Sequence, residues 1–297
     1  MTETAPLDRP HDRPNDLIML TKHHGLGNDF LIAVDPASAG SREPTSKDAK
    51  AWCDRHLGIG ADGLILATPA TDESSAGEPV RHWRMVLWNA DGGRAEISGN
   101  GIRCLGQAIA SHLNLDPSQD QDLVIETDAG TRPLTILAQD GAGDPRTSSV
   151  RAGMGKAVAG PAPSERWSEV DVAPTAQVGV DIGNPHLVAF VPELGSLDMA
   201  TVGPVIEADY PSGLNVHLVE VLANDRLALR VWERGAGVTN ACGSGACAAA
   251  WAAKNAELVT WPVTVDMPGG SATVELVDDE LFLVGPAVRV GEVIIGG

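Results

Sequence analysis

The segment SGNGIRCLGQAIA, residues 98–110, is the most informative about the fold, because it has a counterpart in CGSGACAAAWAA, residues 242–253. Each segment opens with a small residue, Ser98 or Cys242, continues as Gly-x-Gly and leads into a run typical of a helix. The first run places its apolar residues on one helical face, and the second is rich in alanine, a strong helix former. The pattern predicts helices over residues 102–113 and 246–256.

Other segments repeat in the same order around these two. GNDFLIAV (27–34) matches GNPHLVAF (183–190), NADGG (89–93) matches ERGAG (233–237), and glycine hairpins around Gly130 and Gly269 follow the two helices. The separations are nearly constant, between 139 and 156 residues. Because unrelated glycine-rich segments would not keep this order and spacing, the sequence predicts two similar domains.

Short β-branched or aromatic runs, bounded by Gly, Pro, Asn or Asp, fill the rest of the chain. A third helix is predicted over residues 46–56, with Ser46 as its capping residue and Gly58 just beyond its end. Many strands with few helices favour the α+β class. Strands are expected at 17–20, 30–34, 64–67, 83–88, 123–127, 134–137, 187–191, 215–221, 227–232, 263–267 and 281–284.

Composition narrows the classes of function. The 297 residues carry a formal net charge of −19, which disfavours nucleic acid and anionic membranes as partners. No apolar run approaches the ~18–20 residues of a membrane helix, and residues 1–16 lack the apolar region of a secretory signal and are expected to be a disordered tail. Four cysteines without C-x-x-C spacing indicate neither a disulfide framework nor zinc. A cytoplasmic protein with reduced thiols is expected.

The two glycine turns suggest a chemistry. Unpaired amides at a helix N-terminus bind carboxylates, and the helix dipole should lower the pKa of a cysteine placed there, such as Cys242, from ~8.5 towards neutrality. Two such turns facing each other would put a base and an acid on opposite faces of one carbon, as inversion of that carbon requires. The competing interpretation of each turn is an ordinary helix cap with a small buried residue.

The sequence contains no signature of a common cofactor. GLGNDF (25–30) carries G-x-G but leads into a strand, so it fails as a dinucleotide-binding turn. No P-loop is present, and no lysine stands out as a pyridoxal-binding residue. We therefore expect no cofactor and no metal, and a small molecule as the substrate.

Six segments together resemble the diaminopimelate epimerase family: HGLGNDF (24–30), RHLGIGADG (55–63), WNADGGRAEISGNGIRC (88–104), IGNPH (182–186), GLNV (213–216) and ERGAGVTNACGSGACAAA (233–250). The resemblance runs from about Lys22 to Gly291. It implies a pyridoxal-independent epimerase that interconverts LL- and meso-2,6-diaminopimelate for lysine and peptidoglycan precursor synthesis. It also implies two pseudo-symmetric domains, each a sheet wrapped around a central helix: residues 17–153 completed by 285–297, and residues 154–284.

The resemblance also implies roles for individual residues. Cys242 matches one of two catalytic cysteines, but Ser98 stands where the family has the other. His186 and Glu233 match residues that tune the thiols. The residues that match substrate contacts are Asn28, Asn89, Gly99, Asn100, Asn184, Asn215, Glu233, Arg234, Gly243 and Ser244. Gly63 stands where the family often has a glutamine contact, and Gly291 where some members have a tyrosine linked to dimerisation, so a homodimer is only a secondary expectation.

Ser98 raises the main question about mechanism. A serine hydroxyl can donate a proton but is a poor base, and the sequence offers it no activating partner. Cys104 lies about 9 Å further along the helix and is rotated away, so it is expected to pack in the core. Three explanations stay open: an engineered Cys→Ser variant, a natural enzyme using serine and cysteine, or a protein that has lost epimerase activity.

Plainer interpretations stay open as well. Asn89, Asn184 and Asn215 are residue types common in turns and at strand ends, and Arg234 beside Glu233 could form a surface ion pair of little consequence. Two further functions also remain: an epimerase or dehydratase acting on proline or hydroxyproline, and a catalytically impaired protein that binds diaminopimelate.

Overall fold

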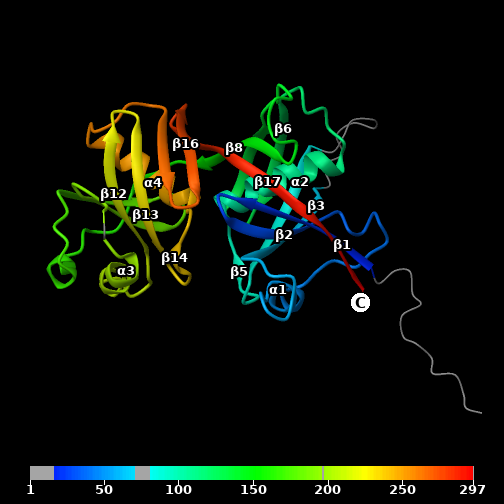
Figure 1. The fold of residues 1–297 in the computed structure, drawn as a ribbon, viewed down its shortest axis with the longest axis horizontal. Coiled ribbons are helices and arrows are strands. Elements are labelled where there is room, and N and C mark those ends of the chain that lie inside the picture. The colour runs from blue at the N-terminus through cyan, green and yellow to red at the C-terminus, as the bar shows by residue number, and fades with distance from the viewer. Residues whose placement is uncertain (1–16, 71–80, 196, 297) are drawn as a thin grey trace, which may run out of the picture.

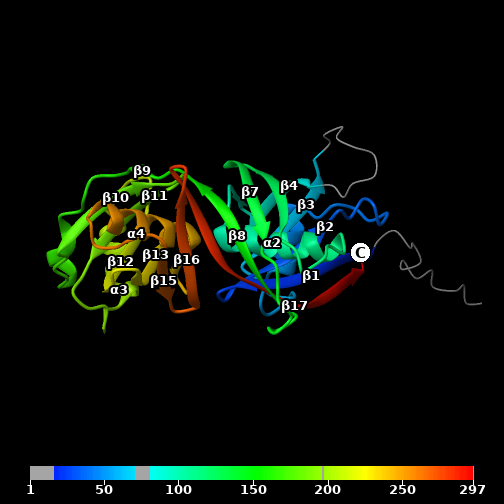
Figure 2. The same ribbon diagram turned by 90° about the horizontal axis from the view of Figure 1, so that it is seen from above.

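A computed structural model describes residues 17–70, 81–195 and 197–296. The predicted tail lies outside these residues. The chain forms two lobes side by side, joined by two strands that pass between them (Figure 1, Figure 2). Strands dominate both lobes, and each lobe has one long helix inside it. The predicted α+β class, with a sheet wrapped around a central helix in each of two halves, is confirmed.

The first half is a closed ring of strands in the order β1, β2, β3, β4, β6, β7, β8 and β17, with β17 pairing back onto β1. Neighbours are antiparallel except for β2 with β3 and β4 with β6, which are parallel. The short strand β5 pairs with the end of β4. The bounds are β1 Leu17–Gly25, β2 Asn28–Val34, β3 Gly63–Pro69, β4 His82–Asn89, β5 Arg94–Ala95, β6 Gln121–Thr127, β7 Gly130–Ile136 and β8 Thr147–Gly155.

The second half repeats this pairing pattern. Strands β10, β11, β12, β13, β15, β16 and β17 follow one another, and β11 with β12 and β13 with β15 are the parallel pairs. The repeat seen in the sequence is thus a repeat of strand order and direction. The bounds are β9 Val158–Ala159, β10 Ala176–Asp181, β11 Pro185–Phe190, β12 Asn215–Ala223, β13 Arg226–Glu233, β14 Gly237–Thr239, β15 Val263–Met267, β16 Gly270–Val277 and β17 Glu280–Gly296.

Strand β17 ties the halves together. Its first residues pair with β16 in the second half, its middle pairs with β8, and its last residues pair with β1 in the first half. The sequence predicted only residues 281–284 of it. The remainder alternates buried and half-buried residues and then turns outward. Gly285, Pro286 and Gly291 interrupt it, and such residues in a sequence usually indicate the end of a strand.

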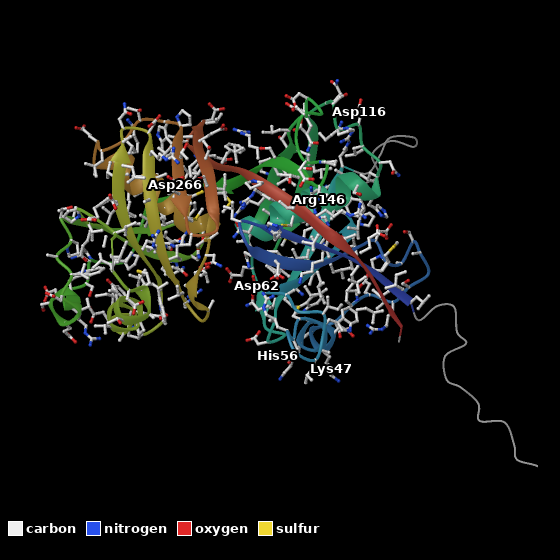
Figure 3. All side chains as sticks on the ribbon, viewed as in Figure 1. Lys47, His56, Asp62, Asp116, Arg146 and Asp266 are labelled. Atoms are coloured by element: carbon white, nitrogen blue, oxygen red, sulfur yellow. The ribbon has the colours of Figure 1, made fainter. Side chains whose placement is uncertain are left out.

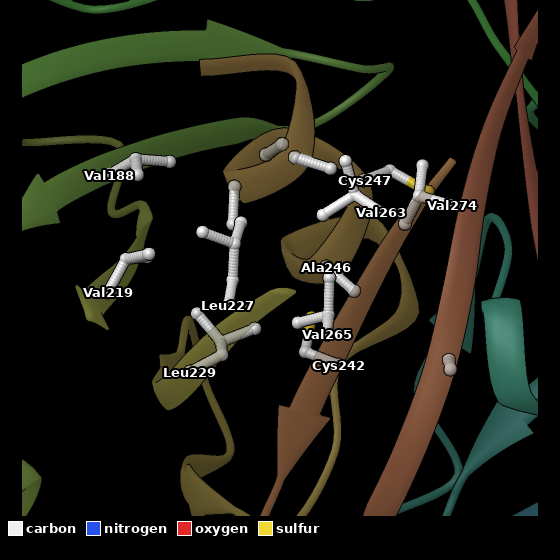
Figure 4. Close-up of a cluster of buried hydrophobic side chains, with 14 of the residues drawn as sticks. Val188, Val219, Leu227, Leu229, Cys242, Ala246, Cys247, Val263, Val265 and Val274 are labelled. Atoms are coloured by element: carbon white, nitrogen blue, oxygen red, sulfur yellow. The ribbon is translucent and has the colours of Figure 1, made fainter. Parts of the chain in front are cut away.

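The central helices are α2 (Gly99–His112) and α4 (Gly243–Asn255). Every residue of α2 from Gly99 to Ile109 is buried, as expected for a helix enclosed on all sides. Figure 4 shows Ala246 and Cys247 of α4 among valine side chains of β15 and β16. Apart from Leu26, the two main core clusters divide between Ala152 and Met154 and again between Leu283 and Ala287, which belongs to the first half. The division accords with the proposed domain boundaries, which stay a prediction.

Strands β8 and β10 were not predicted, and the helices differ from the sequence-based expectations in three details. Helix α1 (Ser46–Trp52) is shorter than predicted and is capped by Thr45, whose backbone amide and hydroxyl both donate to the Asp48 carboxylate. Helix α3 (Met199–Glu207) was missed because it is short and contains Pro204, as was the 3₁₀ helix η2 (Arg166–Val170). No helix of the described residues is long and apolar enough to cross a membrane.

Candidate active site

Ser98 and Cys242 occupy equivalent places at the starts of the two central helices. Each is the N-cap residue, with extended backbone angles of φ −133°, ψ 123° for Ser98 and φ −127°, ψ 113° for Cys242. The Ser98 Oγ accepts a hydrogen bond from the Gly101 amide at 3.0 Å, and the Cys242 Sγ accepts one from the Gly245 amide at 3.4 Å. The repeat therefore extends to the hydrogen bonds of the two turns.

The N-terminal ends of α2 and α4 meet directly. A Cβ atom built on Gly243 would lie 3.0 Å from the Cα of Gly99 and 2.9 Å from the Cδ2 of Leu283. Any side chain at either glycine would therefore push the helices apart. The free amides of both first turns consequently converge on one region, where they can bind an anion.

The Cys242 thiol is buried, and this overturns one expectation. Burial raises the pKa of the Cys242 thiol well above its ordinary value, and the charge of the nearby Glu233 adds to the rise. The helix dipole favours the thiolate, but desolvation is the main influence on the pKa of this buried thiol. Burial also raises the pKa of Glu233, whose carboxylate accepts a hydrogen bond from Thr239 Oγ1 at 2.5 Å. Deprotonation of Cys242 therefore requires hydrogen-bond donors close to the sulfur.

A line of polar side chains leads away from that sulfur. The Cys242 Sγ lies 3.6 Å from the Ser244 Oγ, which lies 3.5 Å from the Asn184 Nδ2. The Asn184 Oδ1 is 2.9 Å from the His186 Nε2, and the His186 Nδ1 is 2.7 Å from the Nε2 of His217. His186, expected to tune the thiol, therefore reaches it only through Asn184 and Ser244. Sequence reasoning missed His217, whose only signal was a polar residue in an apolar strand.

The Ser98 side of the site has a different set of contacts. Asn100 is buried and donates through Nδ2 to the Asn28 Oδ1 and to the Ala241 carbonyl, both at 3.2 Å. Its Oδ1 accepts from Arg103, which is fully buried. Asn28 in turn donates to the Asp62 carboxylate at 2.7 Å, and Figure 3 places Asp62 on the side of the first half that faces the second half. The structure thus brings Asn28 and Asn100 together beside the meeting helices.

The residues expected to hold the far end of a substrate lie at strand ends. Asn215 begins β12, donates to the Pro185 carbonyl at 3.0 Å and accepts from the Arg234 amide at 3.1 Å. Arg234 and Asn89 have exposed side chains, and Arg234 forms no ion pair with Glu233 among the bridges of the described chain. Asn215 therefore fixes the backbone from which the Arg234 side chain projects.

Two positions that depart from the family pattern have a clear structural setting. A Cβ on Gly63 would lie 2.8 Å from the Trp88 carbonyl, so this position has no room for a longer side chain. Cys104 is fully buried in the core of the first half, and burial raises the pKa of its thiol to about 12. Cys104 therefore does not replace the cysteine that the family has at the position of Ser98.

These features define a class of protein. The structure of a predicted epimerase from Pseudomonas aeruginosa superimposes with a TM-score of 0.71 at 16% sequence identity, covering 94% of this chain and 99% of that one. The chain therefore shares its fold of two similar halves with that protein.

The family follows from sequence. The model of the diaminopimelate epimerase family matches residues 20–159 and 178–290. The diaminopimelate epimerase of Synechocystis sp. is 38% identical over 288 residues, which cover 92% of this chain and 97% of the relative. That of Synechococcus elongatus is 36% identical over 288 residues, covering 92% and 96%. The chain belongs to the diaminopimelate epimerase family and is an isomerase.

Proposed function

We propose that the protein interconverts LL- and meso-2,6-diaminopimelate by a two-base proton transfer in which Ser98 takes the place of one catalytic cysteine. The observation that carries the proposal is the meeting of two equivalent helix N-termini, each capped by a residue able to hold a proton. Membership of the family supports the substrate.

The proposed reaction needs the substrate carboxylate between the two first turns. The backbone amides that follow Ser98 and Cys242 would donate hydrogen bonds to the carboxylate and so stabilise the negative charge that grows on it as the α-carbon loses its proton. Gly99, Asn100, Gly243 and Ser244 supply these amides, and the glycines let the ligand approach the backbone. The site uses no cofactor in this scheme.

The two caps would play unequal parts. Cys242, as the thiolate, takes the α-proton and becomes a thiol, while the Ser98 hydroxyl returns a proton to the opposite face and becomes an alkoxide. The cycle closes when water carries the proton of the Cys242 thiol to the Ser98 alkoxide. A serine alkoxide is a costly intermediate, so the Ser98 step should limit the rate. The Cys242 face should exchange protons faster than the enzyme inverts the carbon.

The distal amino-acid end of the substrate would bind Asn89, Asn184, Asn215 and Arg234. The exposed guanidinium of Arg234 is suited to the distal carboxylate. Proline and hydroxyproline lack this second amino-acid end, so these contacts favour diaminopimelate over proline-type substrates.

The setting of the reaction is also proposed. The pathway role would be lysine and peptidoglycan precursor synthesis in the cytoplasm, and all four cysteines are free and buried, which suits a reducing compartment.

A homodimer stays a prediction. Met19 and Ile294 pair across β1 and β17 with 59% and 67% of their surfaces exposed, so sedimentation at several concentrations would test that face.

Substrate comparison tests the proposal. Purified protein should convert LL-diaminopimelate to the meso form and leave hydroxyproline unchanged. Thermal stabilisation by diaminopimelate without conversion would indicate a binding protein instead. Turnover of hydroxyproline alone would establish the proline-type alternative.

A further inference from the structure

The repeat supplies an internal comparison for the residues beneath each helix N-terminus. Phe30 and Ile65, on the parallel strands β2 and β3, lie under α2: a Cβ on Gly101 would be 3.3 Å from the Phe30 ring and 3.2 Å from the Ile65 Cδ1. The equivalent strands β11 and β12 place His186 and His217 under α4, and a Cβ on Gly245 would be 2.4 Å from the His217 ring. Two histidines therefore replace two apolar residues only beneath Cys242.

The two histidines are fully buried and stacked, with ring centroids 5.0 Å apart. Burial lowers the pKa of His217 to about 3 and that of His186 well below its usual range, so both rings are neutral near pH 7. Each neutral ring carries one N–H and one bare nitrogen. The short His186–His217 contact therefore has a single donor.

The direction of that hydrogen bond follows from the atoms at the two ends of the line. The Asn184 Oδ1 can only accept, so His186 carries its proton on Nε2, and its bare Nδ1 accepts from the His217 Nε2. The His217 Nδ1 has no partner and is then a lone pair. Reversing the line would instead bury an unpartnered N–H at that atom, and orphaned buried donors are the rarer case.

We propose that His217 is a positioning residue that holds His186 in its Nε2–H form, so that successive donors of His217, His186, Asn184 and Ser244 all point towards the sulfur of Cys242. Each of these side chains donates a hydrogen bond to the next one on the way to the sulfur. The last donor, the Ser244 hydroxyl, stabilises the thiolate of Cys242. The proposal rests on the proposed role of Cys242 as the base. Nothing equivalent lies under Ser98, where Phe30 and Ile65 have no donor to offer.

Three other polar residues lie close to this line of side chains or act on it electrostatically. Glu233 and Thr239, on β13 and β14, face the Cys242 side, and the positive charge of Arg234 acts on His186. Glu233 opposes the thiolate, so the His217 line and the α4 amides are the groups that favour it. Removing the first donor should therefore raise the energy of the thiolate without touching substrate-binding groups.

The apolar residue of the first half suggests the test variant. His217→Ile copies Ile65 and removes the donor, whereas His217→Gln keeps an N–H that can reach the His186 Nδ1. The rate of iodoacetamide labelling of Cys242, followed by peptide mass spectrometry across pH, reports the thiolate. We expect His217→Ile to label about tenfold more slowly at a fixed pH below the thiol pKa, a shift of about one pKa unit, and His217→Gln to stay within about threefold of the parent.

Nitrogen-15 NMR of the histidine rings tests the same claim in the parent protein and so does not depend on the variants folding. The proposal requires His186 and His217 to be protonated at Nε2 and bare at Nδ1 near pH 7. A proton on the His186 Nδ1, or an unchanged labelling profile in a folded His217→Ile protein, would overturn it. Neither measurement involves substrate, so failure to turn over diaminopimelate would count against the proposed function alone.

Discussion

Gly99 and Gly243 come from positions 144 residues apart in the sequence, yet they form one contact at the centre of the molecule. A Cβ on Gly99 would lie 3.1 Å from the Cα of Gly243. This contact brings the caps of two enclosed helices into one region, and two strands crossing between the halves hold it in place. The proposed proton transfer depends on this approach.

Gly243→Ala should separate the helix ends. The new methyl group would contact the Gly99 backbone and the Leu283 side chain, so we expect the free energy of unfolding to fall by about 1–3 kcal/mol, as for other overpacked sites. Activity should fall as well, because the amides no longer converge. Urea unfolding and initial rates measure the two effects. Gly291→Ala is the matched control, since nothing lies within 4 Å of a Cβ there; equal losses in both variants would refute the explanation.

Ser98→Cys should raise the rate of inversion at least about tenfold. A thiol ionises far more readily than a hydroxyl, so the step on the Ser98 face becomes easier in both directions. Stereochemical analysis of the product over time measures this rate. Ser98→Ala is the companion variant: it should lose inversion and about 1 kcal/mol of stability with the cap. Normal inversion by the alanine variant would exclude Ser98 from the reaction.

Cys242→Ser should lower proton exchange at the substrate α-carbon by about 100-fold or more. Serine also caps helices well, so the fold and the binding of diaminopimelate should persist. Exchange is followed by mass spectrometry and binding by thermal shift. Cys247→Ala changes a cysteine of the same helix that packs in the core, and it should cost stability but retain exchange. A Cys242→Ser protein as active as the parent would remove Cys242 from the mechanism.

Acid should destabilise the fold through its buried histidines. Burial lowers the pKa of His23 to about 4 and that of His217 to about 3, against 6.5 for an ordinary histidine. Below about pH 6.5 the unfolded chain binds protons that the folded chain does not, so stability is full above that pH and is lost as pH falls towards 4. Urea unfolding between pH 4 and 8 measures this slope. His23→Gln should flatten it, while the exposed His56 provides a control as His56→Gln; equal slopes in the parent and His23→Gln would contradict the account.

The sequence was most informative where local rules decide the structure. Each predicted strand overlaps an observed one and overruns it by at most one residue, although β1, β7 and β17 extend four or more residues beyond the predicted ranges. The paired turns were recognisable because glycine has a specific backbone role at both. Helix α3, strands β8 and β10 and most of β17 were not predicted from the sequence. For β17 the reason is that its partners β1 and β8 lie far away in the sequence.

The site was predictable in its residue types but not in its electrostatics. Ser98, Cys242 and the asparagines could be selected from motif and resemblance, and their roles stay predictions. The pKa of the Cys242 thiol is raised, whereas the sequence predicted a lowered pKa, because desolvation depends on how the second half packs. His217 escaped notice for the same reason: only the register of β11 and β12 places its ring beside His186.

The two-face proton transfer is tested by incubating LL-diaminopimelate with the protein in D₂O and following deuterium and configuration at the α-carbon. Cys242 and Ser98 acting on opposite faces predict deuterium incorporation together with slower inversion to the meso isomer. Bound substrate that neither exchanges nor inverts would contradict the account.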